Sequence, residues 1–110
     1  MVWQKSMKLV TEVYKVTSIF PKEEAYGLTS QIRRCAVSIP SNIAEGYGRR
    51  STADYVRFLR MATGSLFELQ TQLEIAVNVG YLESDDFSKE IDRCREIDRM
   101  LSGLIIKITA

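Results

Sequence analysis

Six arginines form the densest group of side chains in this chain that could do chemistry. They lie between residues 33 and 60, where only two acidic residues oppose them, and they are Arg33, Arg34, Arg49, Arg50, Arg57 and Arg60. The guanidinium group offers a rigid fork of N–H donors that matches phosphate oxygens, so the cluster predicts binding to the backbone of RNA or DNA. Two alternatives stay open: a solvated face whose arginines form local ion pairs, and a site for a small carboxylate or phosphate ligand.

The overall charge balance gives this prediction only moderate support. The formal net charge is +1 and the pI is about 7.7, below the value typical of dedicated nucleic-acid modules. The charge is uneven, because residues 1–60 carry ten Lys or Arg against five Asp or Glu, whereas residues 61–110 carry five against nine. The first part therefore attracts anions and the second repels them. No base-reading motif, aromatic stacking platform or recognition helix-turn-helix can be identified.

The absence of histidine removes the commonest catalytic base and metal ligand. Ser-His-Asp catalysis, Cys-His catalysis and His-ligated zinc are excluded, and we expect no enzymatic activity, no cofactor and no metal. Cys35 and Cys94 lack the spacing of metal-binding cysteines and fall on apolar helical stripes, so we expect both to be core thiols. One enzymatic alternative stays open, a pocket in which Arg34, Glu45 and Glu68 fix a dicarboxylate substrate.

The elements that position these residues are predicted from apolar residues at steps of three and four, the pattern of amphipathic helices. Four such stretches are expected, over about Val2–Phe20, Leu28–Tyr47, Ser51–Val79 and Ser84–Ile108. No strand-like alternation competes with them. With 110 residues and short connections, they predict one domain over residues 1–110, an all-α, antiparallel, up-down-up-down four-helix bundle.

Proline, glycine and serine residues mark the predicted helix ends. Pro21 is expected to end the first helix, Ser51 and Ser84 to cap the third and fourth, and Gly80 to end the third in a left-handed conformation. Pro40 lies inside the second pattern, where it removes a backbone hydrogen bond. Because the apolar phase continues on both sides, we expect a proline kink in this helix; a break into two shorter helices is the alternative.

A second apolar surface is expected on the third helix, away from its core-facing arc. It consists of Met61, Phe67, Ile75 and Val79. Contiguous exposed apolar residues usually mark contacts, so these positions predict the interface of a homo-oligomer. The alternative is that they are scattered surface residues with no function.

Two absences in the sequence bear on location. No run approaches the ~20 apolar residues that a membrane-spanning helix needs, and the N-terminal residues lack the apolar core of a signal peptide. We therefore expect a cytoplasmic protein that does not contact a membrane.

A known family is similar to this chain over nearly its whole length. The similarity is carried by QIRRCAVSIPSNIAEGYGRRS, from Gln31 to Ser51, and by FLRMATGSLFELQTQLEIAVNVGYL, from Phe58 to Leu82. These runs resemble the four-helix-bundle proteins encoded in intervening sequences of bacterial 23S rRNA genes. The resemblance implies a ring-like homopentamer. It also extends to the accessory variability determinant of diversity-generating retroelements, a basic pentamer that partners a reverse transcriptase and nucleic acid.

The resemblance also bears on individual residues. It supplies no catalytic residues, and it supports Arg33, Arg34, Arg49 and Arg50 as binding residues, whereas Arg57 and Arg60 rest on the arginine cluster alone. It implies that Ser41, Asn42 and Glu45 organise the kinked helix. The expected function is thus a non-enzymatic oligomer that binds RNA or DNA through arginines. The alternative is a structural or protein-interaction assembly that binds no nucleic acid.

Overall fold

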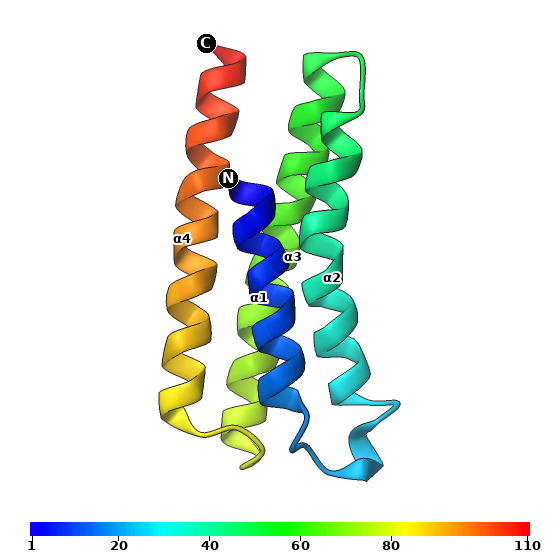
Figure 1. The fold of residues 1–110 in the computed structure, drawn as a ribbon, viewed down its shortest axis with the longest axis vertical. Coiled ribbons are helices and arrows are strands. Elements are labelled where there is room, and N and C mark those ends of the chain that lie inside the picture. The colour runs from blue at the N-terminus through cyan, green and yellow to red at the C-terminus, as the bar shows by residue number, and fades with distance from the viewer.

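Four α-helices and one short 3-10 helix make up the computed structural model, which describes all residues from 1 to 110 (Figure 1). The elements are α1 (Val2–Thr17), η1 (Lys22–Glu24), α2 (Leu28–Tyr47), α3 (Thr52–Asn78) and α4 (Ser84–Thr109). There are no strands. The predicted all-α, four-helix fold class is confirmed, and three of the four predicted helices agree with the structure to within one or two residues.

Consecutive helices run in alternate directions in Figure 1, so the bundle has two distinct ends. The Met1 end holds the start of α1, the loop between α2 and α3, and the last turns of α4. The Gly80 end holds η1 and the loop between α3 and α4. Each helix packs against its neighbour in sequence, and α1 also packs against α4, so the four enclose one core. Because α1 has 16 residues and α3 has 27, α1 leaves the upper turns of its neighbours uncovered at the Met1 end.

The core is built from the apolar stripe of every helix. Side chains with no solvent exposure come from all four, and they include Leu9, Val13, Ile32, Ile39, Leu59, Leu66, Leu73 and Leu101. Their spacing of three, four or seven residues places each set on one face of its helix. Cys35 and Cys94 are both free and buried, as predicted, and burial raises the pKa of each thiol to about 12. Both side chains are therefore in the thiol form at neutral pH.

The helix ends match the sequence at some positions and differ at others. Ser51 caps α3, since its Oγ accepts the Asp54 amide at 3.1 Å, and Gly80 has a φ of +85°, as predicted. The first helix ends at Thr17, three residues before the predicted Phe20. Ser18 there donates its hydroxyl to the Lys15 carbonyl at 2.7 Å, which favours a turn ahead of the proline. The predicted cap Ser84 is instead the first residue of α4, which follows Glu83.

Pro40 does not divide α2, which is one continuous helix from Leu28 to Tyr47. The alternative of two shorter helices is therefore wrong, whereas the size of any kink stays a prediction. In the turn that contains the proline, the Asn42 side chain donates to the Ser38 carbonyl at 2.8 Å. This bond lies beside Pro40, and the organising role expected of Asn42 stays a prediction.

Gly46 lets α2 and α3 approach closely near the Met1 end. A Cβ atom at this position would lie 2.7 Å from Cβ of Phe58 and 3.1 Å from Cδ1 of Tyr55. Any side chain would force the helices apart. The glycine therefore fixes the packing of the two helices that carry four of the six predicted arginines and flank the loop that carries the other two.

Candidate nucleic-acid interface

Arg33 is engaged inside the bundle. Its Nε donates to Oγ1 of Thr17 at 2.9 Å, its Nη2 donates to the Tyr14 carbonyl at 3.3 Å, and its guanidinium carbon lies 4.5 Å from the centre of the Tyr14 ring. These contacts satisfy carbonyl and hydroxyl groups in the last turn of α1 and hold α1 to α2. In this position Arg33 is half-buried, and two of its five N–H donors are used in contacts with α1.

Arg34 lies in a different environment from the other predicted arginines. It lines a polar pocket of about 460 Å³ between α2 and α3, together with Gln31, Cys35, Ser38, Ser65, Glu68 and Gln72. Within this pocket the Ser38 hydroxyl donates to Ser65 at 2.7 Å, and Gln72 donates to Glu68 at 3.1 Å. The structure thus brings Arg34 and Glu68 together, two of the three residues of the enzymatic alternative. Glu45, the third, is paired with Arg49 toward the Met1 end.

The remaining four arginines surround the loop between α2 and α3, and we call them the loop arginines: Arg49, Arg50, Arg57 and Arg60. Arg49 forms an ion pair with Glu45 at 3.1 Å, and Arg57 forms one with Asp54 at 3.5 Å. Their guanidinium carbons lie 4.8 and 4.6 Å from the centre of the Phe58 ring. Both side chains remain about half exposed. Arg50 and Arg60 are exposed and form no ion pair.

Charge is segregated along the bundle axis. The half nearer Met1 consists of about residues 1–8, 38–65 and 95–110, and it carries nine Lys or Arg against four Asp or Glu. The other half carries six against ten. The imbalance seen along the sequence is therefore an imbalance between the two ends of the molecule, and the field draws anions toward the loop arginines.

An aromatic notch, which the sequence did not reveal, lies beside the loop arginines. Its volume is about 700 Å³, and nine of its ten lining residues are apolar. Three aromatic residues from three helices meet there, Trp3 from α1, Tyr47 from α2 and Tyr55 from α3. Trp3 lies more than 40 positions from either tyrosine, so only the packing of α1 against α2 and α4 brings it to them.

The four residues predicted as an oligomer interface are all solvent-exposed, three of them on α3 and Val79 at its C-cap. Met61, Phe67, Ile75 and Val79 each expose between 45 and 55% of their surface. Gly64 lies one helical turn from both Met61 and Phe67, with no atom within 4 Å of where its Cβ would be. In the isolated chain, glycine at this exposed position within a helix stabilises the fold less than alanine would, because alanine is the better helix former.

A second exposed apolar face lies on α1 and α2, and the sequence did not predict it. Met7 and Tyr14 lie two turns apart along α1, and each is 43% exposed. Val37 on α2 is also exposed. This face differs in sequence and shape from the face on α3, so the molecule presents two non-equivalent apolar surfaces.

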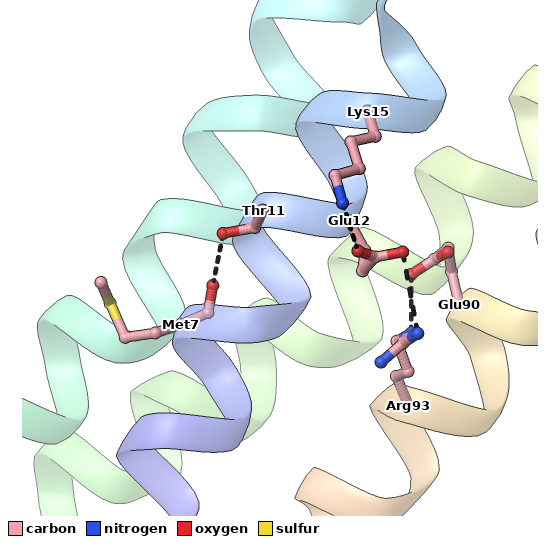
Figure 2. A network of polar contacts seen from close by, with 6 residues as sticks. All are labelled: Met7, Thr11, Glu12, Lys15, Glu90 and Arg93. Carbon is pink, nitrogen blue, oxygen red and sulfur yellow. Dashed lines mark hydrogen bonds and ion pairs between the residues drawn. The ribbon is translucent and has the colours of Figure 1, made fainter.

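A charged network joins α1 to α4 away from these surfaces (Figure 2). Arg93 lies between two carboxylates, with Nη2 3.7 Å from Glu12 and Nε 3.5 Å from Glu90, and Lys15 pairs with Glu12 at 3.3 Å. Glu90 is only 2% exposed. Burial raises the pKa of Glu90, and the Arg93 charge offsets part of that rise. Because these ion pairs join α1 to α4, we interpret the network as structural.

Comparisons with known proteins fit the fold and name no enzymatic activity. A crystal structure from Bacteroides thetaiotaomicron, described as a protein of unknown function from the S23 ribosomal protein family, is similar with a TM-score of 0.85. Its sequence is 24% identical, and the match covers 96% of this chain and 98% of that one. No curated protein matches. None of the helices is long and apolar enough to cross a membrane. Residues 1–103 match the model of the 23S rRNA-intervening sequence proteins, and the chain belongs to this family.

Proposed function

We propose that this protein is a non-enzymatic homo-oligomer that binds RNA or DNA through the loop arginines. The observation that carries the proposal is the concentration of four exposed guanidinium groups at the positive end of an axially polarised bundle, with Arg49 and Arg50 in the α2–α3 loop and Arg57 and Arg60 in the first turns of α3. Guanidinium groups suit phosphate oxygens, and a positive end raises the rate at which a polyanion arrives.

The local contacts of the loop arginines leave them able to bind phosphate. Arg50 and Arg60 have no acidic partner. The pairs that Arg49 and Arg57 form with Glu45 and Asp54 are solvent-exposed, and such pairs contribute little to stability. Stacking on Phe58 orients both guanidinium planes and leaves N–H donors free. A phosphate can therefore displace the acidic partners at small cost.

Assembly is supported by the two non-equivalent apolar faces. A ring with cyclic symmetry needs two different surfaces on each subunit, because every contact joins one face to the other. The α3 face and the α1–α2 face meet this requirement, and the family resemblance favours five copies. Symmetry then repeats the loop arginines once per copy, and the phosphate contacts of the copies add in their salt dependence.

The test is a salt titration of binding to generic RNA and duplex DNA. We expect wild-type affinity to fall steeply with salt, and the Arg49→Glu/Arg50→Glu variant to lose binding. The matched control is Lys22→Glu/Lys89→Glu, which changes the net charge equally at exposed cations in the other half of the bundle. Absence of wild-type binding at ~50 mM salt would reject nucleic-acid binding, and equal losses in both variants would reject the loop arginines as the site.

The second candidate function is an assembly that binds no nucleic acid. The exposed apolar faces on α1 and α3 favour it, because they suit protein contacts and need no polyanion. Under this alternative Arg49 and Arg57 serve only their local ion pairs, and Arg50 and Arg60 are solvated surface charges. It predicts that the Arg49→Glu/Arg50→Glu variant assembles and behaves like the wild type in every binding assay.

A further inference from the structure

The notch at the Met1 end lies where α2, α3 and α4 extend beyond the first turn of α1. In Figure 1 the start of α1 lies lower than the upper turns of α2, α3 and α4. Those turns carry Ile43, Ala44, Tyr47, Tyr55, Met100 and Leu104, and α1 contributes Met1, Val2, Trp3 and Gln4 to the floor and wall. An apolar recess of about 700 Å³ is left open to solvent. Contact between this apolar lining and water costs free energy, and a ligand that covered the lining would recover it.

The aromatic residues of the notch are unusually exposed for a folded domain. Tyr47 is 79% exposed, and its one aromatic neighbour is Tyr55, which meets it edge-on with ring centres 6.2 Å apart. Trp3, which also lines the recess, is exposed as well. Core packing does not account for a ring as exposed as Tyr47. Flat aromatic faces of this kind accept the faces of other planar rings.

The charges near Tyr47 in the chain favour an anionic occupant. Arg49 and Arg50 follow Tyr47 after a single glycine, whereas Glu45, two residues before it, is paired with Arg49. No charged side chain lines the recess itself. Arg50 is free of ion pairs. An occupant thus needs a flat apolar part for the recess and a negative charge beside it. A nucleotide has both, whereas the bases of a duplex are stacked and paired and cannot enter.

We propose that the notch binds an unpaired base of single-stranded RNA or DNA. The base stacks on Tyr47, and Arg49 and Arg50 hold the adjoining phosphates. The polar side-chain groups along the recess are few, namely the Gln4 amide, the Trp3 indole N–H and the two tyrosine hydroxyls, so stacking dominates and base identity matters little. This proposal rests on the proposed function, and it adds a preference for single strands that the loop arginines alone do not supply.

Trp3 provides a direct readout, because it is the only tryptophan in the chain. We expect a single-stranded oligonucleotide to change Trp3 fluorescence, and the duplex of the same sequence to change it little. The Tyr47→Ala variant should bind the single strand about tenfold more weakly, with an unchanged salt slope. The Arg50→Ala variant should instead reduce the salt slope by about one phosphate contact. Tyr26→Ala is the control, since Tyr26 is fully exposed at the other end.

The outcomes separate this inference from the proposed function. If Tyr47→Ala binds single strands as tightly as the wild type while Arg49→Glu/Arg50→Glu loses binding, the notch proposal is overturned and the arginine site stands. Equal wild-type affinity for single strands and duplex would likewise overturn the notch proposal alone. If neither form binds at ~50 mM salt, both proposals fall. Circular dichroism confirms that each variant is folded, which is expected because Tyr47 and Tyr26 are exposed.

Discussion

The hydroxyl of Tyr81 donates a hydrogen bond to Oε2 of Glu24 at 3.0 Å, across 57 positions of sequence. The other carboxylate oxygen of Glu24 accepts the amide of Leu28, also at 3.0 Å, and so caps the first turn of α2. One side chain therefore ties the turn before α2 to the loop after α3. The Tyr81 ring adds a contact with Phe20, with ring centres 5.6 Å apart. These contacts close the Gly80 end of the bundle.

Glu24 should make stability depend on pH in the acidic range. The Leu28 amide, and next the Tyr81 hydroxyl, lower the pKa of Glu24 below its usual 4.5. A lowered pKa stabilises the fold above the unfolded-state value, and the contribution is lost as pH falls through the folded-state value. We expect Glu24→Gln to lower the unfolding free energy at pH 7 and to flatten its fall below pH 4.5. Urea unfolding across that range measures both effects.

Tyr81→Phe separates the hydroxyl from the ring in the same experiment. It keeps the contact with Phe20 and removes only the bond to Glu24, so we expect a smaller flattening than in Glu24→Gln. The Leu28 amide, which is the larger cause of the lowered pKa, remains in place. A Tyr81→Phe variant with a larger effect than Glu24→Gln would contradict this order of contributions.

Helical periodicity predicted the elements but not the contacts between them. The spacing of Ile32, Cys35 and Ile39 predicted α2 and its buried face. Ser51 and Gly80 predicted the two ends of α3, because a serine side chain can cap a helix and a glycine can adopt a left-handed conformation. The partner of Tyr81 is invisible to such patterns, because nothing local relates it to Glu24. The same holds for the notch, where Trp3, Tyr47 and Tyr55 converge only after the helices pack.

The arginine cluster shows the same limit at the candidate site. The sequence grouped six arginines by proximity along the chain, whereas the structure divides them among three environments. Arg33 braces α1 through Thr17 and Tyr14, and Arg34 enters the polar pocket with Glu68. Only the loop arginines stay together. Which N–H donors of an arginine bond within the protein depends on the helix that packs beside it. The sequence around the arginine does not specify that helix.

Arg93→Ala should destabilise the protein more at neutral pH than at acidic pH. Removing Arg93 leaves the buried carboxylate of Glu90 without its nearest cation, and we expect a loss of roughly 2 kcal/mol at pH 7, since the arginine is partly exposed. Burial already raises the pKa of Glu90, and the loss of Arg93 raises it further. As pH falls through this raised value, Glu90 becomes neutral and the penalty shrinks. Unfolding at pH 5 and pH 8 tests the difference.

Glu90→Gln serves as the companion to Arg93→Ala. It removes the buried charge and keeps the size of the side chain, so we expect equal or higher stability at pH 7. In the double variant Arg93→Ala/Glu90→Gln, the pH dependence of the loss should disappear. A loss in Arg93→Ala that is the same at pH 5 and pH 8 would show that Glu90 is not the group left unpaired.

Gly46→Ala should destabilise the bundle through overpacking between α2 and α3. The added methyl would lie 2.7 Å from Cβ of Phe58, which is attached directly to the backbone and cannot rotate away. We expect a loss of about 1–3 kcal/mol, measured as a lower thermal midpoint. Gly103→Ala is the control, because its added methyl meets no atom within 4 Å. That variant should gain about 0.5–1 kcal/mol from higher helix propensity.

Gly64→Ala should act on assembly and on the subunit in opposite directions. For an isolated subunit the substitution resembles Gly103→Ala, since nothing lies within 4 Å of either added methyl, and it should stabilise by about 0.5–1 kcal/mol. If the α3 face packs against another copy, however, the methyl enters a contact shaped around glycine, beside Met61 and Phe67. We therefore expect Gly64→Ala to sediment as smaller species than the wild type at micromolar concentration, with Gly103→Ala unchanged.

The thermal midpoint at two protein concentrations gives an independent check on the Gly64 contact. Assembly makes the midpoint of the wild type rise with concentration, and a weakened contact reduces that rise. In Gly64→Ala the midpoint should depend less on concentration than in Gly103→Ala. If both variants gain stability alike and sediment like the wild type, the centre of the α3 face is not where copies meet. A wild type that sediments as a monomer would remove the homo-oligomer altogether, and with it the reason for glycine at this exposed position.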